Sequence, residues 1–211
     1  MSDQLPEECE RLLTDGLKQL QINTTEEQFQ TLLDFISLMV KWNSAYNLTA
    51  IRDPKEMVIR HLLDSISIKS HTVGKRLLDV GTGPGLPGIP LAILSPSQHF
   101  TLLDSNGKKV RFVRQVTLEL GLKNVEAVQA RVEQFKSEQL FDVITSRAFT
   151  ELAGMYVKSK HLLTNGGRIV AMKGSINTIV MEKRELTDMK SEIIEIDVPF
   201  LKEERHLVIL K

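Results

Sequence analysis

Residues 78–90, LDVGTGPGLPGIP, decide the fold of this chain. Four glycines and three prolines lie between an apolar run typical of a strand and an apolar run typical of a helix. Glycine tolerates positive φ and lets a ligand approach the backbone without a Cβ in the way. The amides at the start of the following helix then face that ligand. The stretch therefore predicts a strand, a ligand-binding loop and a helix in succession.

The chain beyond this stretch alternates short apolar runs with helical ones. We predict strands at 77–80, 100–104, 125–130, 141–145, 168–173, 193–198 and 207–210, and helices at about 87–95, 107–120, 132–138, 151–163 and 178–190. The triplet Asn165-Gly166-Gly167 is predicted to stop a helix before the fifth strand. Pro199 and the charged turn 202–204 leave a connection suited to antiparallel strands. The predicted fold is α/β: a Rossmann-like, doubly wound, mostly parallel seven-stranded sheet with a C-terminal antiparallel hairpin.

Residues 1–72 are predicted to be an N-terminal helical extension, and residues 73–211 the sheet domain. A helix begins at a capping box formed by Thr24 with Glu27 or by Thr25 with Gln28. A break is expected at 43–47. A second helix begins at Asp53-Pro54 and is expected to run to about residue 70.

Composition excludes several classes of protein. The 211 residues carry 27 basic and 27 acidic side chains, so the net charge is zero and neither supports nor excludes a nucleic-acid partner. The single cysteine, Cys9, excludes an internal disulfide framework, and we expect it to lie in a mobile N-terminus. No apolar run reaches the roughly 18 residues of a membrane helix, and the N-terminus does not resemble a secretory signal. We therefore expect a cytoplasmic monomer.

Chemically distinctive residues collect after the predicted strands. Parallel strands end at one edge of an open sheet, and ligands bind outside that edge. The residues in question are Asp79, Gly81, Asp104, Arg131, Val132, Glu133, Ser146, Arg147, Lys173 and Gly174. Asp104, one strand after the glycine loop, is placed to accept hydrogen bonds from ribose hydroxyls. Together they predict a site for a nucleoside-containing ligand.

Two nucleoside ligands fit the loop. Residues 83–88 match the G-x-G-x-x-G pattern of dinucleotide-binding proteins, but only about 120 residues follow and they complete the sheet. An oxidoreductase would need a further substrate domain. The alternative is an acid two residues before G-x-G-x-G, Asp79 to Gly85, which resembles the first motif of class I S-adenosylmethionine methyltransferases.

A longer string is more specific. Residues 80–94, VGTGPGLPGIPLAIL, resemble the ribosomal RNA small-subunit methyltransferase G family, also called glucose-inhibited division protein B. Further motifs agree in order: KWN at 41–43, YNLT at 46–49, RHLLDS at 60–65, LLDS at 102–105, RFVRQ at 111–115, SRAF at 146–149 and ERHL at 204–207. The resemblance runs from about residue 25 to residue 211.

The resemblance implies a bacterial enzyme that uses S-adenosylmethionine to methylate N7 of one guanine in 16S ribosomal RNA. By position, the cofactor contacts of the family fall on Gly81, Leu86, Val132, Glu133 and Arg147. From their positions in the predicted fold we add Asp104 for the ribose and three loop residues for the methionine end of the cofactor: Thr82, Gly83 and Gly85.

The reaction asks little of the protein beyond alignment, because the sulfonium methyl is already electrophilic. Guanine N7 carries a lone pair and no proton, so no general base is needed. An attacking cysteine is not expected, and SRAF replaces the Asn/Asp-Pro-Pro-aromatic motif of amino-group methylation. Arg147 is the best catalytic candidate, since a guanidinium can contact guanine O6, a phosphate or the cofactor carboxylate. Its purely structural alternative is a salt bridge to a strand-end acid such as Asp79.

Basic residues supply weaker candidates for RNA contact. Residues 107–114 carry four bases and no acid, among them Lys108 and Arg111, and Lys173 ends the fifth strand. The alternative is an ordinary solvated helix face, which we expect for at least two of the four bases, and a solvated strand end for Lys173.

Three further side chains are assigned structural roles first. His61 is expected to pack or cap. Trp42 and Tyr46, four apart on one helical face, are expected in the core, and the functional alternative is stacking on a base. No cluster has metal-ligand spacing, so no metal is expected. The predicted partner is 16S ribosomal RNA, presented in a small-subunit particle. The alternatives left open are a methyltransferase for a small molecule or protein, a dinucleotide-dependent oxidoreductase and a non-enzymatic RNA-binding module.

Overall fold

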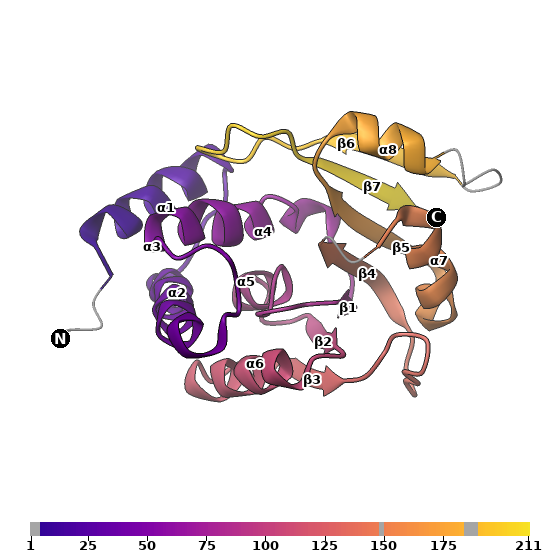
Figure 1. The fold of residues 1–211 in the computed structure, drawn as a ribbon, viewed down its shortest axis with the longest axis horizontal. Helices are drawn as coiled ribbons and strands as arrows, with labels where there is room; N and C mark the ends of the chain where they lie inside the picture. The colour runs from indigo at the N-terminus through magenta and orange to yellow at the C-terminus, as the bar shows by residue number, and fades with distance from the viewer. Residues whose placement is uncertain (1–4, 148–149, 184–189) are drawn as a thin grey trace.

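The computed structural model describes residues 5–147, 150–183 and 190–211, and its strands form a single sheet (Figure 1). In these residues the strand order is β3-β2-β1-β4-β5-β7-β6. The strands are β1 (Arg76–Val80), β2 (His99–Asp104), β3 (Val125–Gln129), β4 (Phe141–Arg147), β5 (Leu163–Lys173), β6 (Ser191–Glu195) and β7 (His206–Leu210). Strands β1 to β5 pair in parallel, whereas β7 is antiparallel to both β5 and β6. The predicted α/β fold with its C-terminal antiparallel hairpin is confirmed.

The winding of the chain defines where a ligand can bind. From β1 the chain winds outward through α5 (Gly88–Leu94), β2 and α6 (Gly107–Glu119) to β3, and then returns to place β4 on the other side of β1. The crevice for a ligand opens at such a reversal of strand order, beyond the carboxyl ends of the strands. In this sheet the reversal lies between β1 and β4.

Two apolar layers sandwich the sheet, because successive strand residues point to opposite faces. Leu77 belongs to one core cluster and Leu78 to the other. The first layer contains α5, α6 and the N-terminal helices α1 (Glu7–Gln19) and α2 (Glu26–Tyr46). The second contains α7 (Leu152–Ser159) and α8 (Ile176–Lys183), which lie at the right of Figure 1.

Short helical turns complete the described chain. They are α3 (Pro54–Met57), the π-helix η1 (Val58–Leu63), α4 (Asp64–Ile66), and the 3₁₀ turns η2 (Lys69–His71) and η3 (Lys160–Leu162). N-terminal Leu13 and Phe35 share one core with Leu102 and Val143 of the sheet. The division at residues 72 and 73 stays a prediction. No helix in the described ranges is long and apolar enough to cross a membrane.

The N-terminal start signals form as predicted, but one predicted break is wrong. Thr25 and Gln28 make the capping box, and the Asp53 side chain caps α3. Helix α2 runs through the expected break to Tyr46 and ends where Asn47 adopts positive φ. Asn43 is tolerated within the helix because its buried side-chain amide forms hydrogen bonds with residues beyond the helix. It donates to the Ile51 carbonyl and accepts from the Thr49 amide.

Two further predictions are corrected. The expected helix 132–138 is only a turn, in which two amides donate to the Arg131 carbonyl. So short a run repays little of the cost of helix nucleation. Asn165-Gly166-Gly167 does not stop a helix but lies within β5. Phe141 pairs with Leu163 and Val143 with Arg168, so residues 164–167 bulge out of register.

Several boundaries also move. Strand β6 covers Ser191–Glu195, so it begins two residues before the predicted strand 193–198 and ends three residues before that strand ends. Residues 196–205 form the connection to β7, and the Ile196 amide donates to the Arg205 carbonyl within it. Helix α8 ends at Lys183, and residues 184–189 of the predicted helix 178–190 lie outside the described part of the chain.

Candidate active site

The glycine loop closes around the carboxylate of Asp79, the penultimate residue of β1. Asp79 Oδ2 accepts hydrogen bonds from Thr82 Oγ1 at 2.6 Å and from the Gly88 amide at 2.9 Å. Three glycines lie between Asp79 and Gly88, and their φ angles are +69° at Gly81, +60° at Gly83 and +91° at Gly85. L side chains rarely adopt this conformation, which explains why the loop needs glycine.

Asp79 is completely buried, and burial raises its pKa to about 7. The bonds from Thr82 and Gly88 and the charge of Arg147 oppose that shift. The other carboxylate oxygen, Oδ1, is buried and receives no hydrogen bond from any described residue. An unpaired buried acceptor is costly, which adds to the preference for the protonated carboxyl group.

Asp104 ends β2 and braces the loop. Its Oδ2 accepts from the Gly83 amide at 2.9 Å and its Oδ1 from the Asn106 amide at 2.8 Å. A carboxylate has about four lone-pair positions, so these two bonds leave acceptor capacity toward a ligand. The predicted ribose contact is compatible with this geometry and stays a prediction.

A cavity of about 370 Å³ opens beside the loop and is called the loop cavity below. It is lined by Val80, Gly81, Leu103, Asp104, Ser105, Lys109, Ala130, Arg131, Val132, Glu133 and Lys158. Four predicted cofactor residues therefore meet in one place: Gly81, Asp104, Val132 and Glu133. Thr82 and Leu86 belong to the loop, are buried and do not line the cavity. Glu133 forms an ion pair with Lys158 at 3.3 Å, and its pKa is lowered chiefly by its own backbone amide.

Arg147 lines a second cavity of about 370 Å³, called the arginine cavity below. Its lining is Ile51, Arg60, His61, Asp64, Arg147, Met172, Lys173, Gly174 and Arg205. Arg147 Nη1 lies 3.3 Å from Asp64 Oδ2, and Arg205 Nε lies 2.9 Å from Asp64 Oδ1. The salt bridge considered for Arg147 forms with Asp64 and not with Asp79, whose Oδ1 has no hydrogen-bond partner among the described residues.

His61 is buried at the wall of the arginine cavity. Its Nε2 lies 2.8 Å from Thr49 Oγ1 and its Nδ1 lies 3.1 Å from the Arg60 carbonyl. Burial lowers the pKa of His61 to about 4, and the charge of Arg147 adds to the effect. The imidazole is therefore neutral and a poor proton acceptor near neutral pH.

The predicted RNA-binding residues occupy different settings. Lys173 is mostly buried in an ion pair with Glu182 at 2.8 Å, and its Nζ also donates to the Thr150 carbonyl. Lys108 and Arg111 are exposed on α6, without an ion pair to any described residue. Their contact with RNA stays a prediction.

The aromatic pair and the cysteine lie in the N-terminal helices. Trp42 and Tyr46 stack with ring centroids 4.9 Å apart, and Trp42 also contacts Phe112 at 5.6 Å. Trp42 is partly buried and Tyr46 is 38% exposed, so the prediction that both are core residues is only partly right. Cys9 is buried within α1, contrary to the expected mobile N-terminus. Burial raises the pKa of its thiol, which makes it a poor nucleophile.

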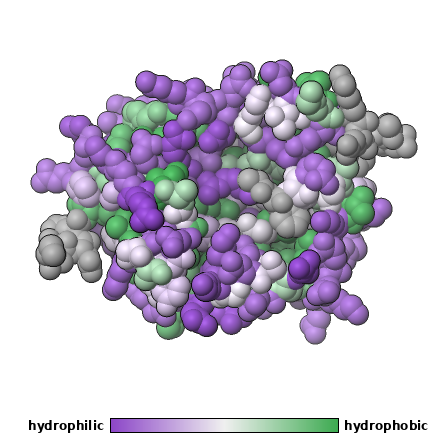
Figure 2. All heavy atoms as spheres, viewed as in Figure 1, coloured by the Kyte–Doolittle hydropathy of each residue, from purple (hydrophilic) through white to green (hydrophobic). Residues whose placement is uncertain are grey.

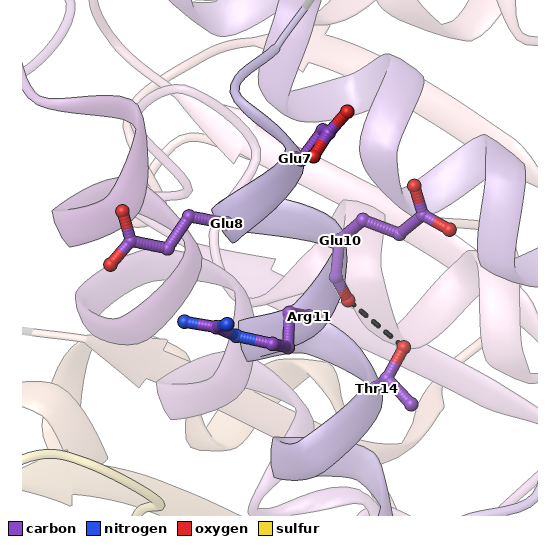
Figure 3. Close-up of a pocket in the computed structure, with 5 residues that line it drawn as sticks. All are labelled: Glu7, Glu8, Glu10, Arg11 and Thr14. Atoms are coloured by element: carbon purple, nitrogen blue, oxygen red, sulfur yellow. Dashed lines mark hydrogen bonds between the residues drawn. The ribbon is translucent and has the colours of Figure 1, made fainter.

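A further hollow lies away from the glycine loop. Figure 2 shows mainly hydrophilic side chains on the face seen in Figure 1, with smaller apolar patches. A hollow of about 480 Å³ lies over α1, and Figure 3 shows its lining: Glu7, Glu8, Glu10, Arg11 and Thr14. It is formed by one helix, and the glycine loop does not contribute to it. In the described ranges no three His, Cys, Asp or Glu side chains are grouped to hold a metal ion.

Sequence reasoning missed the acidic centre of the arginine cavity. Asp64 and Arg205 lie in the quoted motifs RHLLDS and ERHL, but no role was assigned to either. Both motifs contain charged side chains of opposite sign, which is the sequence feature that could have indicated an ion pair between them. Of the motif SRAF, Ser146 donates its hydroxyl to the Val80 carbonyl, whereas residues 148 and 149 lie outside the described part of the chain.

The loop cavity is compatible with a nucleoside ligand. Positive-φ glycine allows close approach to the backbone, and Asp104 retains acceptor capacity for ribose hydroxyls. Asp79 is completely buried and does not line the cavity, so its role is to hold the loop through Thr82 and Gly88.

Comparisons with known proteins agree. The model of the family described as rRNA small subunit methyltransferase G matches residues 28–208. A relative named ribosomal RNA small subunit methyltransferase G, from Serratia proteamaculans, is 51% identical over 208 residues, covering 96% of this chain and 98% of the relative. A relative of the same name from an Enterobacter species is 50% identical, covering 92% and 94%. A solved S-adenosylmethionine-dependent methyltransferase from Aquifex aeolicus shares the fold, with a TM-score of 0.58, 15% identity and coverage of 74% of this chain and 92% of its own.

Proposed function

The chain belongs to the rRNA small subunit methyltransferase G family, and on this basis we propose that it methylates N7 of one guanine in 16S ribosomal RNA. It is an S-adenosylmethionine-dependent methyltransferase of ribosomal RNA. Family membership replaces the dinucleotide-dependent oxidoreductase and the non-enzymatic RNA-binding module as interpretations of the glycine loop. We propose a small-subunit particle as the substrate, since a chain without net positive charge is expected to bind naked RNA weakly.

The observation that carries the proposal is the placement of the two cavities. The glycine loop follows β1 and Arg147 ends β4, and these strands pair in parallel with Asp79 opposite Thr145. A cofactor held against the loop would therefore lie next to a base held in the arginine cavity. Placing two reactants side by side is the main contribution a protein can make to a transfer whose donor is already activated.

The bound cofactor supplies an electrophilic methyl group, and the side chains present fit an acceptor atom that carries no proton. His61 lines the arginine cavity with its pKa lowered to about 4, so it is unsuited to remove a proton near neutral pH. Guanine N7 needs no such step. We assign Arg147 the task of orienting the substrate by donating hydrogen bonds to guanine O6 or to a neighbouring phosphate, which leaves the N7 lone pair free to attack the methyl group.

The test is methyl transfer from labelled S-adenosylmethionine to small subunits that lack the modification. Naked 16S RNA is assayed in parallel at the same concentration. The proposal expects label on the particle at a higher rate than on naked RNA. Absence of label on both, from a protein that still binds S-adenosylhomocysteine, would refute the RNA assignment and favour a small molecule or a protein as acceptor.

A further inference from the structure

Asp64 is the only acidic side chain among the described residues that line the arginine cavity, and it serves two arginines at once. It is 1% exposed and follows directly after the π-helix η1. Its two oxygens bind guanidiniums that approach from β4 and from the segment before β7. Because π-helical turns occur often at functional sites, its position is itself an indication of a role.

The carboxylates around the arginine cavity are equal in number to its four cations but are shared unevenly among them. Arg60 forms ion pairs with Glu56 and Glu203, and Lys173 is paired with Glu182. Arg147 and Arg205 have one carboxylate between them. Both side chains are 24% exposed, so this unbalanced charge faces solvent at the cavity.

Each arginine keeps unused donors. Arg147 donates through Nη1 to Asp64 and to the Arg60 carbonyl, and its Nε and Nη2 donate to no described residue. Arg205 donates through Nε to Asp64 and through Nη1 to the Glu204 carbonyl, which leaves its Nη2 without an acceptor in the same part of the chain. None of these nitrogens is among the buried unpaired atoms, so all are accessible.

We propose that Asp64 is a positioning residue that holds Arg147 and Arg205 as a clamp for one oxyanion, and that this oxyanion is an RNA phosphodiester beside the target guanine. The inference rests on the proposed function. Guanidiniums bind phosphate in a planar, two-donor geometry, so fixing their orientation matters as much as their charge. Asp64 acts through the arginines and does not itself touch the RNA.

An oxyanion could also come from the carboxylate of the cofactor. The geometry favours RNA, because both arginines line the arginine cavity and neither contributes to the loop cavity. The two sources make different predictions for cofactor affinity and for RNA affinity, so the experiment measures both.

The experiment compares Asp64→Asn with wild type and with Asp142→Asn. Asp142 lies near the start of β4, at the opposite end of the strand from Arg147, where its carboxylate accepts from the Lys75 and Arg76 amides. The affinity for S-adenosylhomocysteine is measured by calorimetry. KM and kcat are measured with unmethylated small subunits over a range of salt concentrations.

The clamp predicts that Asp64→Asn raises KM for subunits about 10- to 100-fold, because charge-assisted contacts lose their alignment. The affinity for S-adenosylhomocysteine is expected to change by less than about threefold, within the neutral range for a residue outside the binding site. The salt dependence of KM should weaken by about one phosphate contact. Asp142→Asn should change none of these quantities. Arg205→Lys keeps the charge but loses the planar fork, and should also raise KM for subunits.

Three results would overturn the inference. A loss of S-adenosylhomocysteine affinity with unchanged KM for subunits would assign the clamp to the cofactor carboxylate. A lower KM in Asp64→Asn would show that Asp64 only reduces the positive charge. An unchanged KM in Arg205→Lys would remove the clamp even if Asp64→Asn fails to fold. If wild type transfers no methyl group, the proposed function fails, and equilibrium binding of subunits to the same variants still tests the clamp.

Discussion

Replacing Gly83 by alanine separates backbone strain from ligand exclusion. Gly83 has φ of +60°, and an added Cβ would lie 3.9 Å from Lys109 Nζ and 4.0 Å from the Gly81 carbonyl oxygen. These are ordinary contacts, so the ligand-free protein has room for the methyl group. Lys109 and Gly81 both line the loop cavity, which means that the methyl group occupies space beside the proposed cofactor.

Gly121 provides a matched control. It has φ of +64° in the turn after α6, and an added Cβ would meet nothing within 4 Å. Left-handed backbone costs an alanine about 1–2 kcal/mol, partly offset by the reduced entropy of the unfolded chain. Both variants should therefore lose similar stability, with melting temperatures lower by about 2–4 °C per kcal/mol for a chain of this size.

Only Gly83→Ala should weaken cofactor binding. An extra methyl group in a close-packed contact costs about 1–3 kcal/mol, which corresponds to a dissociation constant for S-adenosylhomocysteine raised about 5- to 150-fold. Calorimetry gives this constant, and melting without ligand gives the stability. Wild-type affinity in Gly83→Ala would refute the placement of the cofactor against the loop. An equal loss in Gly121→Ala would show that the effect is not local.

Further predictions concern buried charged groups. The pKa of His61 falls from 6.5 to about 4 on folding, so between these pH values the unfolded chain binds one more proton than the folded chain. His61 therefore makes the free energy of unfolding rise from pH 4 to pH 6.5. His61→Gln should flatten that rise when unfolding is measured by urea titration. The pKa of Asp79 rises from 3.8 to about 7 on folding, so the free energy of unfolding should fall as the pH rises between these values. Asp79→Asn should remove this fall and be more stable than wild type at pH 8. The same variant should bind S-adenosylhomocysteine more weakly in calorimetry. Glu182→Gln leaves mostly buried Lys173 without its counter-charge and should cost about 1–3 kcal/mol in denaturant unfolding.

The parts of the site that local chemistry determines could be predicted from the sequence. A glycine-rich loop after an apolar run has few possible uses, and glycine is the residue type that permits the positive φ found at Gly81, Gly83 and Gly85. The sheet edge then brought Asp104 to the loop, because parallel strands end together. The family resemblance supplied the ligand and the acceptor, which periodicity does not reveal.

The arginine cavity could not be predicted, because its contacts join distant segments. Asp64 and Arg205 are 141 residues apart, and no local pattern specifies which of many charged residues will pair. The wrongly predicted helix break at 43–47 has a similar cause. The side-chain amide of Asn43 forms hydrogen bonds with residues beyond the helix, so a residue with weak helix propensity stays inside α2. In each case a tertiary contact outweighs the local preference.

The most direct test of the central claim maps the labelled methyl group on the RNA. Small subunits from cells that lack this enzyme are methylated in vitro, and the 16S RNA is cleaved at 7-methylguanine by reduction and strand scission. We predict one cleavage site, which should be absent in RNA from reactions with Gly83→Ala under limiting cofactor. Label that resists scission, or scission at many guanines, would contradict methylation of a single guanine N7.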